Sequence, residues 1–142
     1  MRIVFVCLGN ICRSPAAEGV MRKLAPDLTL DSAGTGGWHV GDAPYGPMQD
    51  AAKRRGVDLS QLKARQFTSA DFENFDLIVA MDQQNKADIE RLRPAGNQTP
   101  VQLMADTDVS DPYYTRDFDA ALTMIEEAAK RLLVDISQRR DR

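Results

Sequence analysis

The sequence predicts an α/β fold: a single domain over residues 1–142, with a parallel sheet that helices cover on both faces. Short apolar runs of strand length alternate with segments of helical periodicity, and this alternation is typical of parallel sheets. The first apolar run, Arg2–Val6, leads into a loop that contains glycine and then into a helical pattern. Such sheets bind ligands at the carboxyl ends of their strands, so we expect the functional site at this loop.

The composition fits a globular protein and excludes several classes of function. Apolar residues make up 43% of the chain and charged residues 27%, and the net charge of −3 argues against general nucleic-acid binding. The basic runs Lys53–Arg55 and Arg139–Arg140 lie at expected helix C-termini, where positive charge is favourable without a partner. No apolar run is long enough to span a membrane, and no secretory signal pattern is found, so we expect a cytoplasmic protein without membrane contact.

The first half of the chain supplies two predicted strands and a helix between them. Arg2–Val6 is a continuous apolar run after its first residue and indicates a fully buried strand. Ser14 can cap the next helix, Pro15 suits its first turn, and Pro26 ends it. Leu28–Ser32 is the second expected strand.

A loop rich in glycine and proline is expected over residues 33–46, and Pro47 opens a second helix that Gly56 closes. Asp76–Ala80 is the third expected strand. Asp82 then has the position and side chain of a helix cap, and this helix stops before Pro94.

The last part of the chain contains a fourth expected strand, Val101–Met104, a polar loop over residues 105–116, and a long helix. The helix is the clearest element, because its apolar residues recur at spacings of three and four. These residues are Phe118, Ala121, Leu122, Ile125, Ala129, Leu132, Leu133 and Ile136. We find no repeat and no sign of a second domain.

The loop Cys7–Pro15 has the features of an anion site. A loop between a strand and a helix N-terminus aims several backbone N–H groups at one point, and the helix dipole adds positive potential. Gly9 permits unusual backbone angles and Asn10 tolerates a left-handed one. The planar guanidinium of Arg13 can hold two phosphoryl oxygens at once.

Cys7 is the candidate nucleophile of this loop. The positive surroundings favour its thiolate, and the hydroxyl of Ser14 can donate a hydrogen bond to that thiolate. Cysteine, clamp and hydroxyl together indicate a cysteine-dependent phosphatase. The alternative is a buried cysteine that ends a strand, with Arg13 on the surface; buried cysteine is common, but this alternative leaves the pattern of the whole loop unexplained.

Asp111 is the candidate acid that protonates the leaving group. An aspartate before proline is usually a turn former, but its pairing with the Cys7 loop favours catalysis. Asp106 and Asp108 belong to the same predicted loop and compete for the role, and we expect both to be solvated. Asp82 is expected mainly as a helix cap.

Several segments resemble the low-molecular-weight protein tyrosine phosphatases, in particular bacterial members whose pocket is lined by aromatic residues. The matching segments span nearly the whole chain: Cys7–Pro15, Asp31–Thr35, Trp38, Ala64–Gln66, Phe75–Asp76, Met81–Asp82 and Asp111–Tyr114. The resemblance implies a four-stranded parallel sheet flanked by helices, with the phosphate-binding loop after the first strand. It also implies a phosphotyrosine-containing protein as substrate.

The resemblance assigns roles to individual residues. Cys7 would be the nucleophile that forms a phosphocysteine, Arg13 the phosphate clamp, and Asp111 the general acid and then base, with no metal and no cofactor. Ser32 would support Asn10 in holding the loop. The residues implied to contact phosphate or substrate are Leu8, Gly9, Asn10, Ile11, Cys12, Ser14, Trp38 and Tyr113.

The sequence departs from the family pattern at three places. Leu62–Lys63 stands where many relatives carry a histidine, which removes a hydrogen bond into the Asn10 network. Tyr45–Pro47 replaces an Asp-Pro-Arg segment, and His39 stands where some relatives have asparagine. We expect His39 to be a loop residue.

Three other functions are considered beside tyrosine phosphatase. A thiol-coupled arsenate reductase needs further cysteines downstream, and none follows Cys12. A phosphoarginine phosphatase would carry threonine at Ile11 and phenylalanine at Tyr113. An inactive phosphoprotein-binding module would have lost the nucleophile, clamp or acid. Cys12 is either a packing residue or a resolving thiol that forms a disulfide with Cys7 under oxidation. We expect the protein to be a monomer.

Overall fold

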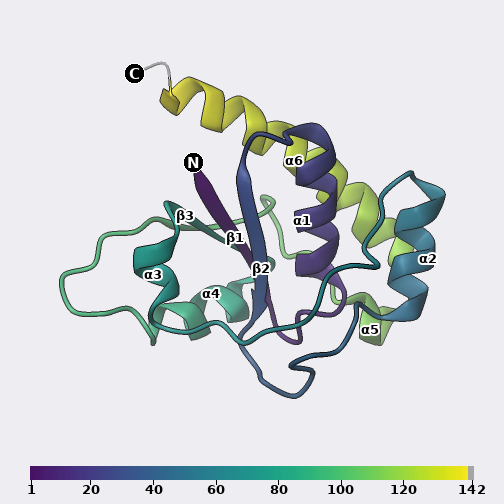
Figure 1. Ribbon diagram of the computed structural model, residues 1–142, viewed down its shortest axis with the longest axis horizontal. Helices are drawn as coiled ribbons and strands as arrows, with labels where there is room; N and C mark the ends of the chain where they lie inside the picture. The colour runs from purple at the N-terminus through teal and green to yellow at the C-terminus, as the bar shows by residue number, and fades with distance from the viewer. Residues whose placement is uncertain (141–142) are drawn as a thin grey trace.

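Four parallel strands form the centre of the computed structural model, which describes residues 1–140 (Figure 1). The strands are β1 (Arg2–Cys7), β2 (Thr29–Gly34), β3 (Leu77–Ala80) and β4 (Val101–Leu103). Their order in the sheet is β2-β1-β3-β4, and every neighbouring pair is parallel. The predicted α/β fold with four parallel strands is therefore confirmed.

Both faces of the sheet are buried. Alternate residues of β1 point to opposite sides, so Ile3 and Phe5 belong to one core and Val4 and Val6 to the other. All four side chains are fully buried. This double burial is the reason that β1 reads as a continuous apolar run without polar alternation.

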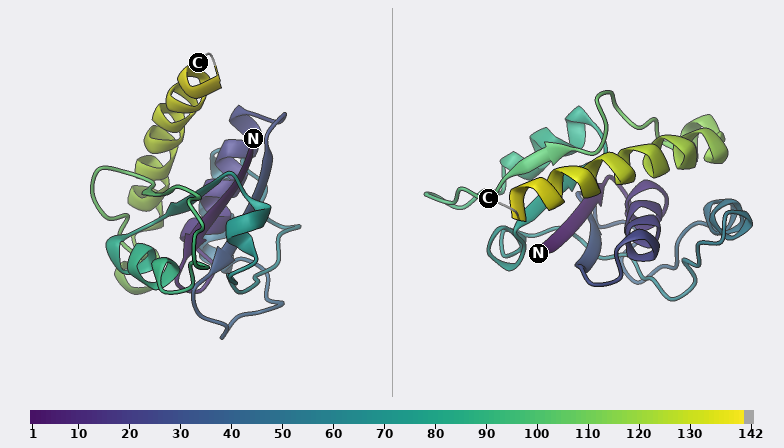
Figure 2. Two further views of the ribbon diagram at one scale, coloured as in Figure 1. Left: turned by 90° about the vertical axis from the view of Figure 1, so that its left-hand side faces the viewer. Right: turned by 90° about the horizontal axis from the view of Figure 1, so that it is seen from above.

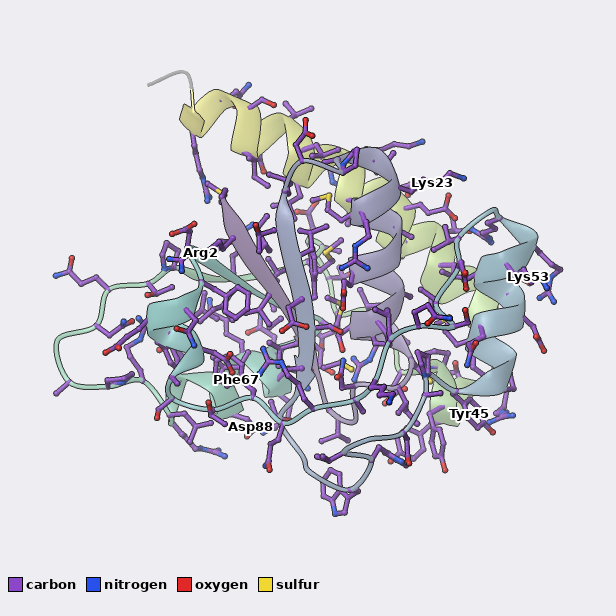
Figure 3. The ribbon with its side chains drawn as sticks, in the orientation of Figure 1. Arg2, Lys23, Tyr45, Lys53, Phe67 and Asp88 are labelled. Atoms are coloured by element: carbon purple, nitrogen blue, oxygen red, sulfur yellow. The ribbon has the colours of Figure 1, made fainter. Side chains whose placement is uncertain are left out.

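Helices cover the two faces unequally (Figures 1 and 2). The larger core lies under α1 (Arg13–Leu24), α2 (Gly46–Arg54) and α6 (Phe118–Arg140), and α1 and α6 pack against each other. The smaller core lies under α3 (Asp71–Asn74) and α4 (Gln83–Glu90), which contribute Phe72 and Ile89. Figure 3 shows Phe67 on this smaller side as well.

The ends of three helices test the sequence predictions. Asp82 caps α4, because its Oδ1 accepts a hydrogen bond from the backbone N–H of Asn85 at 2.7 Å. Gly56 follows α2 with a φ of +79°, the left-handed conformation in which glycine ends helices. The prediction that Ser14 caps α1 is wrong: α1 begins at Arg13, its N-cap is Cys12, and the Ser14 hydroxyl turns toward Cys7.

Two short helices were not predicted. The segment 105–116, expected as loop, contains α5 (Pro112–Thr115), which Asp111 caps by accepting a hydrogen bond from Tyr113 N–H at 3.0 Å. The other is α3, where Asp71 accepts from Thr68 N–H at 2.8 Å. Each helix has four residues, too few to show a helical period in the sequence. Within residues 1–140, no helix combines the length and the apolar character needed to cross a membrane.

Candidate active site

Cys7 lies at the carboxyl end of β1 and opens the loop that leads into α1. Its side chain is almost fully buried, and two groups of the loop contact its sulfur. The backbone N–H of Asn10 donates to Cys7 Sγ at 3.3 Å, and Ser14 Oγ lies 2.9 Å from the same atom. The loop therefore surrounds the sulfur with donors that suit a thiolate.

Asn10 fixes the shape of this loop from inside. Its φ is +57°, a left-handed conformation that asparagine adopts more readily than most residues. Its side-chain Nδ2 donates to Ser14 Oγ at 2.8 Å and to Ser32 Oγ at 3.0 Å, and its Oδ1 accepts from the backbone N–H of Arg65 at 3.0 Å. Three separate segments thus meet at one buried side chain.

The structure assigns the left-handed angle to Asn10, whereas Gly9 does not have a positive φ. Glycine at position 9 instead makes room, because a Cβ there would lie 3.2 Å from Cδ2 of His39. Gly34 makes room on the other side of the loop, where a Cβ would lie 2.8 Å from the carbonyl oxygen of Leu8. Close approach, and not backbone strain, explains both glycines.

Arg13 is buried in the first turn of α1 and is held on one side by acceptors. Its Nη1 donates to Oδ2 of Asp82 at 2.7 Å and to the carbonyl oxygen of Val109 at 2.8 Å. Its Nη2 lies 3.4 Å from Oδ2 of Asp111. The Nε atom is buried and has no partner among the described residues. One edge of the guanidinium is therefore anchored, and Nε is left to donate to a bound oxyanion.

Neighbouring negative groups stabilise the positive charge of Arg13. Burial by itself lowers the pKa of Arg13, but the negative charge of Cys7 and the hydrogen bond to Asp82 raise that pKa above its ordinary value. The carboxylate of Asp111 acts in the same direction. The guanidinium thus stays positive next to the cysteine that it would serve.

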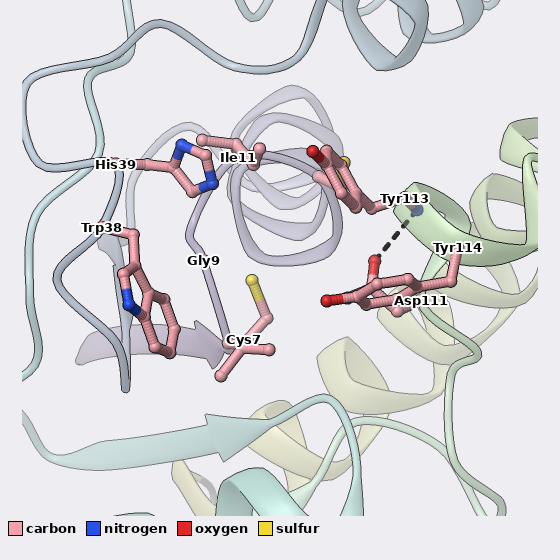
Figure 4. Close-up of a pocket in the computed structure, with 10 residues that line it drawn as sticks. Cys7, Gly9, Ile11, Trp38, His39, Asp111, Tyr113 and Tyr114 are labelled. Carbon is pink, nitrogen blue, oxygen red and sulfur yellow. Dashed lines mark hydrogen bonds between the residues drawn. The ribbon is translucent and has the colours of Figure 1, made fainter.

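Of the three candidate acids, the structure brings only Asp111 to Cys7. Asp111 lines the same pocket as Cys7, and its Oδ1 is held by the backbone N–H of Tyr113 (Figure 4). Asp106 and Asp108 are exposed and do not line this pocket. Asp108 accepts instead from the backbone N–H of Gln83 at 3.0 Å.

The pocket has a volume of about 260 Å³ and aromatic walls (Figure 4). Trp38 and His39 stand on one side of Cys7, and Tyr113 and Tyr114 stand on the other. Trp38 remains 73% exposed, so it forms an outer wall of the pocket. The remaining lining residues are Leu8, Gly9, Ile11, Cys12 and Asp111.

The sequence-predicted residues therefore fall into two groups. Leu8, Gly9, Ile11, Cys12, Trp38 and Tyr113 line the pocket with Cys7 and Asp111. The side chains of Asn10, Ser14 and Ser32 lie buried behind the loop and bond to one another. His39, which sequence reasoning treated as an ordinary loop residue, lines the pocket as well, and its Nδ1 lies 3.1 Å from Oδ2 of Asp42.

Sequence reasoning missed the two charged residues that hold the back of the loop. The side chain of Arg65 donates to Asp31 at 2.9 Å and to Asp71 at 3.0 and 3.1 Å, which fixes the backbone N–H that Asn10 accepts. Glu18 accepts from Ser32 Oγ at 2.7 Å. Arg65 lies in one of the matching segments, but nothing in the spacing of Glu18 linked it to the loop.

Cys12 is a buried thiol that lines the same pocket as Cys7. Burial, and after it the negative charges of Asp111 and Cys7, together raise the pKa of Cys12 to about 12, against the opposing charge of Arg13. Cys12 is thus protonated at neutral pH. Across residues 1–140 we find no group of three His, Cys, Asp or Glu side chains arranged to hold a metal ion.

Comparisons with known proteins agree with this site. Residues 2–142 match the family model described as low molecular weight phosphotyrosine protein phosphatase. The low molecular weight protein-tyrosine-phosphatase YfkJ of Bacillus subtilis is 37% identical over 149 residues, which covers 96% of each chain. The low molecular weight phosphotyrosine protein phosphatase of Schizosaccharomyces pombe is 41% identical over 128 residues, with 80% of this chain and 81% of the relative covered.

Solved structures extend the similarity to the fold. The crystal structure of YfkJ from Bacillus subtilis superimposes with a TM-score of 0.92 at 36% identity, covering 98% of this chain and 96% of that one. The crystal structure of DARP, a drosophila arginine phosphatase, superimposes with a TM-score of 0.90 at 32% identity, covering 96% of this chain and 98% of that one. The same fold therefore carries two named phosphatase activities.

Proposed function

We propose that Cys7, Arg13 and Asp111 carry out the reaction of this chain, which belongs to the low molecular weight phosphotyrosine protein phosphatase family and is a cysteine-dependent protein tyrosine phosphatase. The main support for this proposal is that three functional groups meet around one pocket. The sulfur of Cys7 and the carboxyl of Asp111 line it, and Arg13 lies buried behind them with a free Nε.

In the first step the thiolate of Cys7 attacks the phosphorus of phosphotyrosine. The S–P bond forms as the P–O bond breaks, and the electron pair of that bond stays on the tyrosyl oxygen. Asp111 in its protonated form gives this oxygen a proton, since a phenol of pKa about 10 is a poor leaving group as an anion. The loop amides and Arg13 stabilise the negative charge on the transferred phosphoryl oxygens.

In the second step water hydrolyses the phosphocysteine. Asp111, now ionised, takes a proton from the attacking water, the P–O bond forms, and the S–P bond breaks. The electron pair returns to Cys7 as a thiolate. The hydroxyl of Ser14 and the backbone N–H of Asn10, 2.9 and 3.3 Å from the sulfur, stabilise that leaving group.

The walls of the pocket favour an aromatic substrate group. Trp38 and Tyr113 stand on opposite sides of Cys7, and Tyr113 is braced by Tyr45 with ring centroids 5.2 Å apart. A phenyl ring between aromatic side chains gains both apolar burial and ring–ring contact. We therefore propose tyrosine-phosphorylated proteins as the substrates. Because all the proposed catalytic groups come from one chain, we propose that the enzyme acts as a monomer. We also propose a cytoplasmic location, where the reducing conditions would keep Cys7 as a free thiol.

A second candidate is phosphoarginine, because the drosophila structure with a TM-score of 0.90 is titled an arginine phosphatase. Ile11 and Tyr113 argue against it here. Ile11 is an apolar side chain that lines the pocket near the reaction centre, where a guanidinium leaving group needs a polar partner. Phosphotyrosine is the better match.

Initial rates on a phosphotyrosyl peptide, a phosphoarginyl peptide and a phosphoseryl peptide test the assignment directly. We expect the phosphotyrosyl peptide to be preferred by at least about tenfold in kcat/KM. Cys7→Ser should abolish turnover and still bind inorganic phosphate, because the anion site consists of backbone amides and Arg13. Arg13→Ala should lose both turnover and binding. Substantial turnover by Cys7→Ser would rule out Cys7 as the nucleophile.

The protein substrate can be identified with the same variant. Cys7→Ser binds but cannot turn over, so it should retain tyrosine-phosphorylated proteins from the native cell. Release of the retained proteins by excess phosphate or vanadate would show that they occupy the active site. Wild-type enzyme serves as the control, since it should release dephosphorylated product.

A further inference from the structure

Glu18 is a buried carboxylate on α1 that does not line the pocket and takes no part in the reaction described above. Its side chain is 4% exposed. Oε1 accepts from Ser32 Oγ at 2.7 Å, and Oε2 accepts from Nη2 of Arg22 at 2.6 Å. Burying a charged carboxylate costs free energy even when it is paired, so a functional role for these contacts is worth testing.

The contacts of Glu18 continue to the nucleophile through three side chains. Ser32 has a single hydroxyl hydrogen, which it donates in a hydrogen bond to the carboxylate of Glu18. Ser32 Oγ therefore acts toward Asn10 as an acceptor, of the hydrogen that Nδ2 donates at 3.0 Å.

The second hydrogen of Asn10 Nδ2 goes to Ser14 Oγ at 2.8 Å. Because Ser14 accepts from Asn10, its own hydrogen must point elsewhere. Cys7 Sγ at 2.9 Å is the nearer acceptor, and the carbonyl oxygen of Ala33 at 3.4 Å is the other one. Donation in this chain of hydrogen bonds therefore starts from the two hydrogens of one NH₂ group, that of Asn10: it runs through Ser32 to Glu18 on one side and through Ser14 to the sulfur on the other.

We propose that Glu18 is a positioning residue for the reaction, whose carboxylate sets the direction of this chain so that Ser14 donates to the thiolate of Cys7. The inference rests on the proposed role of Cys7 as nucleophile. It extends the site beyond the residues that line the pocket, to an ion pair between Glu18 and Arg22 on α1.

The charge of Glu18 depends on Arg22. Burial raises the pKa of Glu18, and the hydrogen bonds from Ser32 and Arg22 and the charge of Arg22 oppose that rise. Asp31 on β2 adds to the rise, although its own carboxylate is paired with Arg65 Nε at 2.9 Å. Arg22 is thus the cation that holds the buried carboxylate in its ionised form.

Glu18→Gln is the direct test, because it keeps the size of the side chain and reverses one contact. A guanidinium cannot accept a hydrogen bond, so the glutamine oxygen must face Arg22 and its NH₂ must face Ser32. The two lone pairs of Ser32 Oγ can accept from both Asn10 and the new amide, but the hydroxyl hydrogen loses the acceptor that fixes its orientation. The Ser32 hydroxyl should rotate toward a new acceptor, which weakens its contact with Asn10 and thereby loosens the orientation of Ser14.

The expected result is a change in the thiolate and not in substrate binding. The pH midpoint for alkylation of Cys7 by iodoacetate, followed by peptide mapping without substrate, should rise by about one pH unit, equivalent to about 1.4 kcal/mol. The value of kcat on a phosphotyrosyl peptide should fall by about tenfold, with KM changed much less. The melting temperature should change little, because removal of the buried charge offsets the loss of the acceptor for the Ser32 hydrogen.

Glu126→Gln is the matched control. Glu126 on α6 also forms a 2.6 Å ion pair with an arginine, Arg55, but has no link to the Cys7 loop. The alkylation midpoint and kcat of this variant should equal those of the wild type. If Glu18→Gln also matches the wild type, or loses kcat only together with melting temperature, Glu18 is a packing residue and the proposal is wrong.

Arg22→Ala provides a second test that does not alter Glu18. Loss of this cation should raise the pKa of Glu18 further, so the variant should resemble Glu18→Gln at low pH and recover toward wild type as the pH rises. Arg22→Ala in the Glu18→Gln background should show no such recovery. An unchanged pH profile in Arg22→Ala would contradict the proposal. Absence of phosphotyrosine hydrolysis by the wild type would overturn the proposed function instead, and alkylation would still report on Glu18.

Discussion

Arg13 and Asp82 form a 2.7 Å ion pair that connects the phosphate loop to the start of α4. Asp82 uses its two oxygens for two tasks: Oδ2 accepts from Arg13, and Oδ1 caps α4 by accepting from Asn85 N–H. The residue that begins a helix on one face of the sheet therefore also orients Arg13, the proposed phosphate clamp, which begins α1 on the other face.

Replacement of Asp82 should separate these two tasks. Asp82→Asn keeps an oxygen that can cap α4 but turns an NH₂ toward the Arg13 guanidinium, so we expect near-normal stability and a fall in kcat/KM of about tenfold or more. Asp82→Ala should lose the same activity and also about 1 kcal/mol of stability. Urea unfolding and initial rates measure both. Asp108→Asn, at an exposed neighbour that contacts α4 but not Arg13, is the control and should keep full activity.

Asp111→Asn should slow the enzyme according to the leaving group. With a tyrosyl leaving group the loss in rate should be about 10²–10⁴, because the departing oxygen needs a proton. With an aryl phosphate whose phenol is already acidic, the loss should be much smaller. An equal loss on both substrates would mean that Asp111 only anchors α5 and Arg13 and gives no proton.

Hydrolysis should continue in excess chelator. Arg13 and the loop amides supply the positive charge that phosphoryl transfer requires, so we expect the same rate on an aryl phosphate with and without chelator. Vanadate should inhibit, because it adopts the five-coordinate geometry of the phosphorus in the transition state. A rate that drops on chelation and returns with one divalent metal would refute this assignment.

Oxidation should produce a bridge between Cys7 and Cys12, which line the same pocket. Cys12 has a pKa raised to about 12, so peroxide should attack the thiolate of Cys7 first, and the Cys12 thiol should then resolve the sulfenic acid as a disulfide. Activity should return with a thiol reductant. Cys12→Ser should recover much less activity after equal exposure, and peptide mapping should find the bridge in the wild type alone. Equal recovery of both proteins would leave Cys12 as a packing residue.

The raised pKa of Glu18 predicts how stability depends on pH. Because the folded state binds this proton more tightly than the unfolded chain, the contribution of Glu18 is most favourable below its ordinary pKa of 4.5 and is lost as the pH rises through the folded-state value. Free energies of unfolding in urea should show Glu18→Gln gaining on the wild type from about pH 4.5 upward. A difference independent of pH would mean that the carboxyl titrates normally in the folded protein.

The strands and the loop that carries the proposed nucleophile were predictable because their signals are local in the sequence. Ile3–Val6 is buried on both faces and so has no polar interruption, and the loop after it carries cysteine, asparagine and arginine within seven positions. The cap at Asp82 is equally local, since an N-cap acts on N–H groups two and three residues later. The structure confirms the strands and this cap, and the catalytic roles rest on the experiments above.

The prediction for Ser14 was wrong because the residue lies within the first turn of α1 and not at the N-cap. Serine before proline fits an N-cap pattern, but Ser14 lies inside α1 with its hydroxyl bonded to the Cys7 loop. The four-residue helices α3 and α5 escaped prediction, because so short a helix has no period and depends on contacts such as the one between Asp71 and Arg65.

The sequence by itself determined the positions of the apolar strands, the anion loop and the residues that could react in it, since each depends on neighbours a few positions apart. Asp111 was already the preferred acid from the sequence, but only the tertiary structure placed it in the pocket and decided what holds the loop from behind. Asp106, Asp108 and Asp111 have the same side chain, but only Asp111 directly precedes α5, and the turn into this helix brings it to the pocket. Glu18 became linked to Cys7 only because β2 carries Ser32 between α1 and Asn10, a contact across 22 residues that no local pattern records.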